Sequence, residues 1–96
     1  MITRVVKLSF EADRIEPFKK IFNDTKDGIR SFKGCIEVNA FQHAADPSVF
    51  FTISKWDSEA DLENYRNSEF FTKVWTLTKQ GFKEKPEAWT LNQVQN

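Results

Sequence analysis

The segment from Phe32 to Trp75 constrains the fold most, because it holds two strands in hairpin order followed directly by helix. An Asp-Pro pair at positions 46 and 47 supplies the turn of the hairpin. A strand and a helix precede this segment, and one strand follows it. The order βαββαβ predicts an α+β sandwich, in which helices cover only one face of a four-stranded antiparallel sheet. The other face then needs a partner, and we expect an oligomer.

Four segments have the pattern of strands. Residues Ile2 to Phe10 alternate between apolar and polar side chains, although Arg4 interrupts the apolar face. Cys35 to His43 also alternates, and the β-branched and aromatic run from Val49 to Trp56 is typical of a central strand that pairs back on it. The last strand is predicted over Ala88 to Val94.

Two regions have the pattern of helices. Asp13 and Glu16 fit a capping box, so the first helix is expected to begin near Arg14 and to end before Gly34. Its apolar stripe recurs at spacings of three and four residues, through Ile15, Phe18, Phe22, Thr25, Ile29 and Phe32. Ser58 and Ser68 are predicted to cap two further helical segments.

Length and charge limit the class of protein. Residues 1–96 are predicted to form a single domain, which is short enough that burial of its apolar surface stays incomplete without association. Fourteen basic and fourteen acidic side chains cancel, so neither nucleic acid nor a membrane is expected as a partner. The single cysteine, Cys35, and the absence of a signal peptide or a long apolar run predict a soluble, cytoplasmic protein.

Aromatic residues are abundant, with ten Phe, three Trp and one Tyr. This abundance has two possible interpretations, a Phe-rich core or a flat cavity lined by aromatic rings. On the free face of the sheet we expect a mixture too aromatic for open solvent, namely Val5, Lys7, Glu37, Asn39, Phe41, Phe50, Thr52 and Trp89. Two such faces packed across a two-fold axis would bury these side chains.

The sequence contains no motif for a nucleotide or metal cofactor. Its three glycines are scattered and cannot form a phosphate-binding loop. His43 and Cys35 are too few for an ordinary zinc or iron site, and the acidic residues between 57 and 63 fit a solvated helix start. A metal site made only of carboxylates stays open as an alternative, but we expect no cofactor.

Individual residues leave alternatives open. Trp56 either closes the core or presents its indole N–H to a ligand oxygen, and Tyr65 and Trp75 either pack in the core or face a site. Arg4 lies either at a frayed strand end or against a polar or anionic pocket, because an unpaired guanidinium is costly to bury. His43 can exchange a proton near neutral pH, although its place beside the turn predicts exposure.

Four segments carry a resemblance to a known family and together span roughly the whole chain. They are Gly34-Cys35-Ile36-Glu37-Val38, Asp46-Pro47, Lys55-Trp56-Asp57-Ser58-Glu59-Ala60 and Asn67-Ser68-Glu69-Phe70-Phe71. The chain resembles the antibiotic biosynthesis monooxygenase (ABM) domain family. That resemblance implies a ferredoxin-like subunit that forms a dimeric α+β barrel.

The resemblance narrows the fold more than the reaction. It covers cofactor-free oxygenases of anthrone- or quinol-like aromatics, haem-degrading oxygenases and an isomerase of a phosphorylated signalling molecule. Arg4, Tyr65 and Trp75 stand where the haem-degrading branch has Asn, Trp and the haem-ligating His, so that route is not expected. Many members also carry a helix-borne His where this chain has Tyr65, and a histidine base at that position is missing.

The resemblance implies a cofactor-independent monooxygenase that binds a small aromatic substrate and acts as a homodimer. In that interpretation Trp56 donates to the substrate oxygen, Tyr65 or His43 handles the proton, and Arg4 balances the developing charge. The predicted walls of the binding site are Phe51, Phe71 and Trp75.

Other classes share this element order. A non-catalytic, ligand-binding or stress-associated dimer of the same fold, or an isomerase, is the first alternative. An RNA-recognition domain is the second, but the third strand lacks the basic surroundings that such a domain needs.

Overall fold

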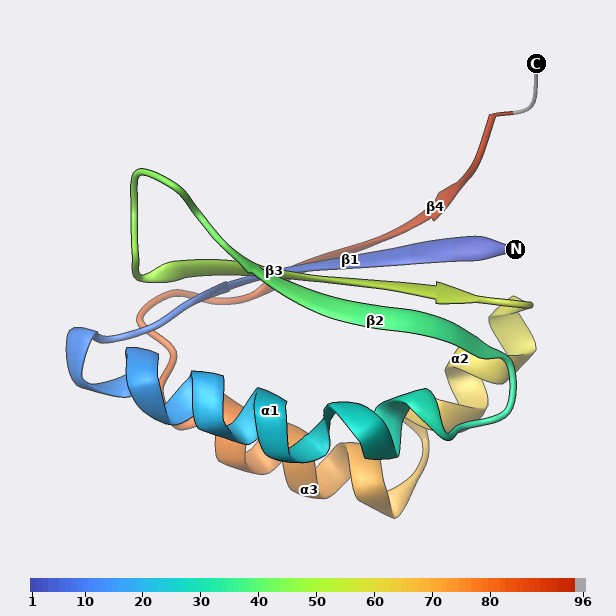
Figure 1. Cartoon of the computed structure of the whole chain (residues 1–96), viewed down its shortest axis with the longest axis horizontal. Coiled ribbons are helices and arrows are strands. Elements are labelled where there is room, and N and C mark those ends of the chain that lie inside the picture. Colours follow the sequence, from blue (N-terminus) through green and yellow to red (C-terminus); the bar gives the residue numbers. More distant parts are fainter. Residues whose placement is uncertain (95–96) are drawn as a thin grey trace.

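The computed structural model describes residues 1–94, and residues 95–96, which complete the predicted single domain, lie outside the described residues. A sheet of four strands lies over a layer of helices (Figure 1). The strands are β1 (Ile2–Ser9), β2 (Cys35–Gln42), β3 (Val49–Trp56) and β4 (Glu87–Asn92). The helices are the short η1 (Ala12–Arg14), α1 (Ile15–Arg30), α2 (Glu59–Arg66) and α3 (Glu69–Lys79).

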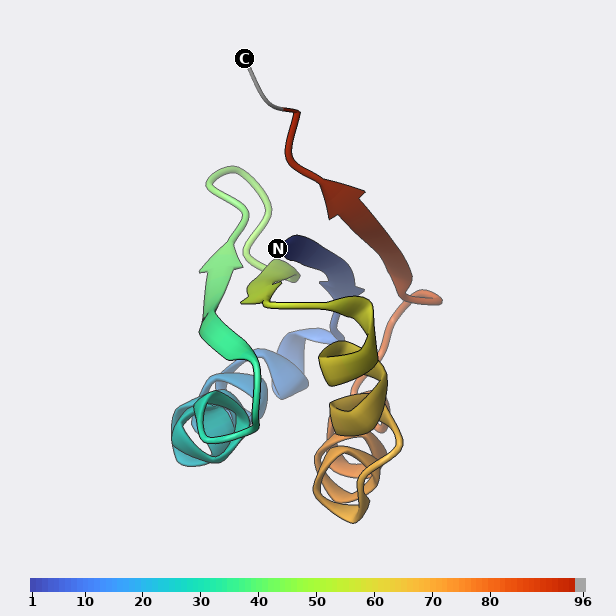
Figure 2. The ribbon, with the colours of Figure 1, turned by 90° about the vertical axis from the view of Figure 1, so that its right-hand side faces the viewer.

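The sheet has the order β2-β3-β1-β4, and all of its neighbours are antiparallel. Within residues 1–94, all helices lie on one face of the sheet, and the other face carries none (Figure 2). Both observations confirm the predicted ferredoxin-like α+β fold. Between residues 1 and 94, no helix combines the length and the apolarity needed to cross a membrane.

Helix boundaries follow the predicted pattern with one exception. Ser58 and Ser68 cap α2 and α3 as predicted, because their side chains accept hydrogen bonds from the backbone N–H groups of Asp61 and Phe71. The prediction of a capping box at the start of the first helix is wrong. A 3-10 turn precedes α1 instead, and the residue at the N-terminal cap, Arg14, makes no side-chain capping bond.

Gly34 makes the turn from α1 into β2. Its φ of 83° lies in the left-handed region that side chains disfavour. A Cβ at this position would also collide with the carboxyl group of Asp61. The predicted end of the helical region before Gly34 is confirmed, although α1 itself ends at Arg30.

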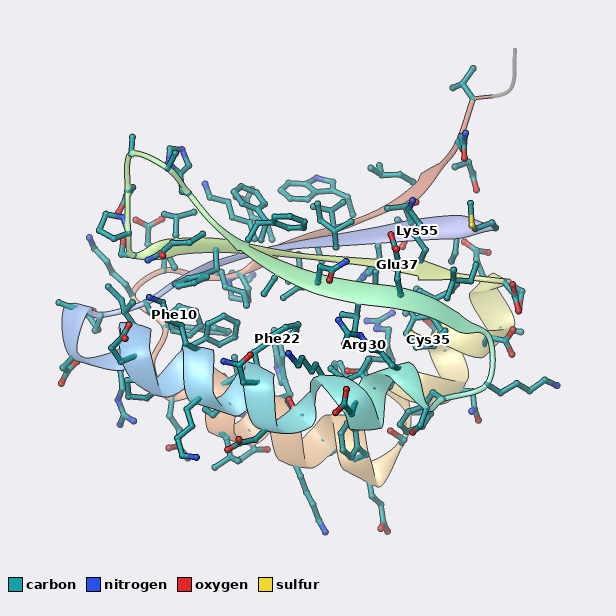
Figure 3. The ribbon with its side chains drawn as sticks, in the orientation of Figure 1. Phe10, Phe22, Arg30, Cys35, Glu37 and Lys55 are labelled. Atoms are coloured by element: carbon teal, nitrogen blue, oxygen red, sulfur yellow. The ribbon has the colours of Figure 1, made fainter. Side chains whose placement is uncertain are left out.

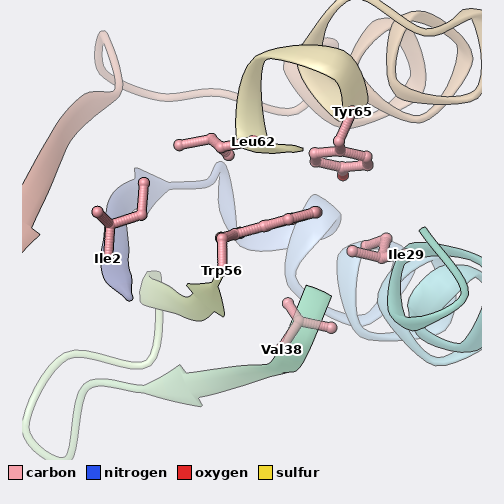
Figure 4. Close-up of a cluster of buried hydrophobic side chains, with 6 residues drawn as sticks. All are labelled: Ile2, Ile29, Val38, Trp56, Leu62 and Tyr65. Atoms are coloured by element: carbon pink, nitrogen blue, oxygen red, sulfur yellow. The ribbon is translucent and has the colours of Figure 1, made fainter. Parts of the chain in front are cut away.

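Two aromatic clusters fill the two ends of the space between sheet and helices. At one end, Phe10 is almost fully buried and lies against the rings of Phe18, Phe50 and Phe82. Phe10 lies between the sheet and α1 (Figure 3). At the other end, Trp56 lies among Ile2, Ile29, Val38, Leu62 and Tyr65 (Figure 4). The middle of the sheet carries smaller or polar inward side chains.

The uncovered face of the sheet corrects part of the prediction. Val5 pairs with Ile53 and Lys7 with Phe51, so Ile53 and Phe51 lie on this outer face. Phe50 and Thr52, which were predicted on the outer face, point toward the helices instead. The odd-numbered residues of β3 face outward and the even-numbered ones face inward, the reverse of the prediction. Exposed apolar side chains remain on the outer face, among them Phe41 and Trp89.

Ion pairs lie beside these apolar groups. Lys55 contacts Glu37 at 3.4 Å and Lys7 contacts Glu87 at 3.9 Å, both across neighbouring strands. Figure 3 shows Glu37 and Lys55 next to each other on the sheet. The outer face is therefore apolar with locally neutralised charge.

Substitution of Phe10 tests the first cluster. Phe10→Ala removes a ring that is 1% exposed, and we expect the free energy of unfolding to fall by about 3–5 kcal/mol. Leu77→Ala, at a side chain that is 53% exposed on α3, should change it by less than about 0.5 kcal/mol. Urea denaturation followed by circular dichroism measures both. Equal, small changes would contradict the assignment of Phe10 to the core.

Candidate functional site

A cavity of about 360 Å³ lies between the middle of the sheet and the helices. Its size is at the lower end of the range for small-molecule sites, roughly 300–1,000 Å³. Most of its walls are apolar, with a few polar groups. The residues that matter below are Arg4, Thr52, Ser54, Tyr65, Arg66, Phe71, Trp75 and Ala88.

The opening of the cavity lies between α2 and β4. Of all its lining residues, Arg66 and Ala88 are the two that are exposed, and the others are buried or half-buried. Arg66 ends α2, and Ala88 lies on β4 at the edge of the sheet. A ligand would therefore enter between the end of α2 and this edge strand.

Arg4 lies on the inner face of β1 and lines the cavity, which decides between its two predicted positions. Its Nη1 donates a hydrogen bond to the hydroxyl oxygen of Thr90 at 2.9 Å. Burial lowers the pKa of Arg4, the positive charge of Arg66 lowers it further, and Glu63 acts in the opposite direction. Arginine nevertheless stays charged in proteins, so Arg4 places a fixed cation in the cavity wall.

Tyr65 is buried between the two layers and lines the same cavity. Its ring stacks on Trp56, with centroids 5.1 Å apart, and meets the ring of Phe71 edge-on. Burial raises the pKa of its phenol, and the negative charge of the Cys35 thiolate raises it further. At neutral pH Tyr65 is therefore protonated, which makes it a hydrogen-bond donor or an acid rather than a base.

Trp56 has no exposed surface and lies behind the cavity wall, not on it. Its indole N–H donates to the hydroxyl oxygen of Ser54 at 3.0 Å, and Ser54 lines the cavity. The predicted indole donor is thus used within the protein. The Ser54 hydroxyl, with one lone pair occupied, keeps its own proton for a further partner.

Phe71 and Trp75 form an aromatic part of the cavity wall. Both residues lie on α3 and line the cavity. Their rings stack with centroids 5.9 Å apart and an interplanar angle of 11°. Because stacked rings face each other, the free ring face and the ring edges of this pair give an aromatic surface against which a planar aromatic molecule can pack.

Two predicted residues lie away from this cavity. Phe51 belongs to the outer face of the sheet, where it is paired with Lys7 and Phe41. His43 lies at the exposed end of the β2–β3 hairpin, and its Nδ1 accepts backbone hydrogen bonds from Ala45 and Asp46. Within one chain, neither residue can reach a ligand in the cavity.

Sequence reasoning missed Ser54, Thr52 and Arg66. The first two would follow from the correct parity of β3, since both share a face with Trp56. Arg66 directly follows Tyr65 at the end of α2, and no sequence pattern marks it as a cavity residue. Among residues 1–94, no group of three or more His, Cys, Asp or Glu side chains could hold a metal ion.

The fold and the cavity can be compared with known proteins. The model of the antibiotic biosynthesis monooxygenase family matches residues 1–75. This chain belongs to that family. The match covers β1 through most of α3, and therefore all of the lining residues discussed above except Ala88. No curated protein matches the chain.

Solved structures of this family fold are closely similar in shape and distant in sequence. A structure of an antibiotic biosynthesis monooxygenase has a TM-score of 0.92 at 18% identity, covering 99% of this chain and 100% of that one. A conserved protein from Methanosarcina mazei Go1 has a TM-score of 0.91 at 18% identity, with coverages of 98% and 94%. A candidate monooxygenase of this family from Nitrosomonas europaea has a TM-score of 0.91 at 15% identity, with coverages of 97% and 89%.

A titration tests the environment of Tyr65 directly, because it is the one tyrosine of the chain. Phenolate absorbance of the folded ABM protein should rise only above the usual tyrosine pKa of about 10, since burial disfavours the anion. The same protein unfolded in urea should titrate near 10 and serves as the control. The stability that the neutral phenol contributes is then complete below pH 10 and decreases as the pH rises toward the folded pKa. A folded midpoint at or below 10 would contradict this environment.

Proposed function

We propose that this protein is a cofactor-independent monooxygenase that acts on a small, electron-rich aromatic substrate of the anthrone or quinol type. The observation that carries the proposal is one cavity that combines the stacked rings of Phe71 and Trp75 with the donors Arg4 and Tyr65. Membership of the ABM family supports the same reaction class.

The first step is loss of a proton from the substrate. The anion that forms spreads its charge onto the substrate oxygen, and the fixed cation of Arg4 stabilises it. The neutral hydroxyl of Tyr65 donates a hydrogen bond to the same oxygen. Because Tyr65 stays protonated, the proton leaves to water at the cavity opening rather than to this side chain.

The second step consumes dioxygen, and its electrons come from the substrate. The anion passes one electron to O₂, and the resulting radical and superoxide combine in a carbon–oxygen bond. After protonation, the peroxide breaks its O–O bond and loses water, so that an anthrone CH₂ becomes a carbonyl. One oxygen atom enters the product and the other enters water. The substrate carbon supplies all four electrons, and no external reductant takes part.

Trp56 and Ser54 have a positioning role in this proposal. The indole N–H of Trp56 orients the Ser54 hydroxyl, which then directs its proton toward the cavity. Trp56 therefore acts on the substrate through Ser54 and not directly. His43 and Phe51, which were predicted from sequence to take part, do not line this cavity and have no role in the present proposal.

Oxygen uptake tests the function. Metal-stripped protein should consume O₂ with at least one member of a panel of anthrones and quinols, saturably, and heat-denatured protein should not. Substrate incubated under ¹⁸O₂ should gain one labelled atom, with the second in water. Tyr65→Phe should lower kcat roughly a hundredfold because it removes a donor to the developing anion.

Asn64→Ala is the matched control, since Asn64 is the exposed neighbour of Tyr65 on α2. This variant should keep the parent kcat, and circular dichroism should show both variants folded. Unlabelled product, or uptake that survives denaturation, would count against a monooxygenase.

The same cavity would also serve a non-catalytic binding protein or an isomerase. Arg4 and Tyr65 would stabilise the enolate of an isomerisation as well as the anion proposed above. Binding without oxygen uptake across the whole panel would favour one of these alternatives.

We also propose that the protein works as a homodimer whose two subunits pack their outer sheet faces together into one barrel. The exposed apolar side chains on this face support the arrangement, since Phe41 is 52%, Trp89 43% and Leu91 48% exposed. Ion pairs within each subunit neutralise the charges of Lys7 and Lys55. Two copies can therefore approach without charge repulsion.

Light scattering at micromolar concentration should give the mass of two 11.3-kDa chains. Phe41→Asp and Trp89→Asp should each halve that mass, because the face would carry an unpaired charge into the contact. Leu77→Asp introduces the same charge on the solvent side of α3 and should leave the dimer intact. A monomeric parent protein would rule out the barrel.

A further inference from the structure

A second guanidinium, which the proposed reaction does not use, stands at the opening of the cavity. Arg66 ends α2 and lines the cavity together with Arg4. Burial lowers the pKa of Arg4, and the nearby positive charge of Arg66 lowers it further. The two cations therefore share one end of the cavity, although like charges repel.

Few groups of the protein neutralise this pair. No Asp or Glu lines the cavity within residues 1–94. Outside it, Glu63 accepts a hydrogen bond from Nη1 of Arg66 at 2.7 Å, one turn earlier on the same helix. Arg4 has the uncharged hydroxyl of Thr90 as its hydrogen-bond partner. One carboxylate against two guanidinium groups leaves one positive charge at the opening.

The aromatic wall fixes where the rest of a ligand would lie. Phe71 and Trp75 stack on α3, which directly follows the α2 helix that carries Arg66. A ligand that packs its ring on this wall can therefore point a substituent toward the two arginines. Arginine binds a carboxylate through two parallel hydrogen bonds, which suits a planar acid group.

We propose that the substrate of this cavity is an aromatic carboxylate, whose ring packs on Phe71 and Trp75 and whose acid group binds between Arg4 and Arg66. The aromatic part rests on the function proposed above, and the carboxylate is new. Arg66 then determines specificity by selecting an acid over its neutral analogue. One carboxylate also matches the single uncompensated positive charge.

A binding comparison tests the carboxylate without any turnover. The probes are 2-naphthoate and 2-naphthamide, which have the same rings and nearly the same shape and differ in charge. Calorimetry on the parent protein at low ionic strength should show 2-naphthoate binding at least about tenfold more tightly, because hydrogen bonds to a charged group are the stronger ones. Equal affinities, or binding of neither probe, would overturn the proposal.

Variants assign the preference to Arg66. Arg66→Gln should weaken the binding of 2-naphthoate about tenfold and leave the affinity for 2-naphthamide unchanged. Lys73→Gln, which removes the same charge from an exposed position on α3, should leave both affinities unchanged. Equal losses in the two variants would show that only net charge matters and would also overturn the proposal.

The two proposals can fail separately. Preferential binding of 2-naphthoate without oxygen uptake from any quinol, carboxylated quinols included, would support the acid site and reject the monooxygenase. Oxygen uptake together with equal binding of the two naphthalene probes would support the monooxygenase and reject the acid site.

Discussion

Two aromatic clusters hold the helices against the sheet, one at each end of the sheet. The cavity exists because no such cluster fills the space between the two ends. Along β1, Ile2 belongs to one cluster and Leu8 to the other, and Arg4 and Val6 between them line the cavity. On β3, Trp56 and Phe50 mark the same two ends. The middle residues need not fill space, so they are free to be polar.

The polar groups of the cavity depend on the packing around them. Tyr65 is protonated because it is buried between Trp56 and Phe71, and it is buried because its ring completes the cluster around Trp56. Ser54 is oriented by the indole of Trp56 in the same way. One buried tryptophan therefore positions two of the donors in the cavity without touching a ligand itself.

Sequence patterns predicted the elements of the fold well and the members of the site less well. The βαββαβ order and the Ser58 and Ser68 caps follow from local sequence patterns, which the structure confirms. Trp75 lines the cavity, whereas the sequence left core packing open for this residue. The outer face of β3 was predicted with the wrong parity, because a strand rich in apolar residues on both faces gives no clear alternation. Arg66 was missed because its neighbours in space, Arg4 above all, are distant in sequence.

The edge position of β4 has a consequence for how such a protein diversifies. All six residues of β4 are exposed, and the strand lies beyond the segment that the family model matches. Substitutions on its inner side would reshape the entrance while leaving both aromatic clusters unchanged, at little cost in stability. Selection can therefore alter what enters the cavity through β4 independently of the residues that keep the chain folded.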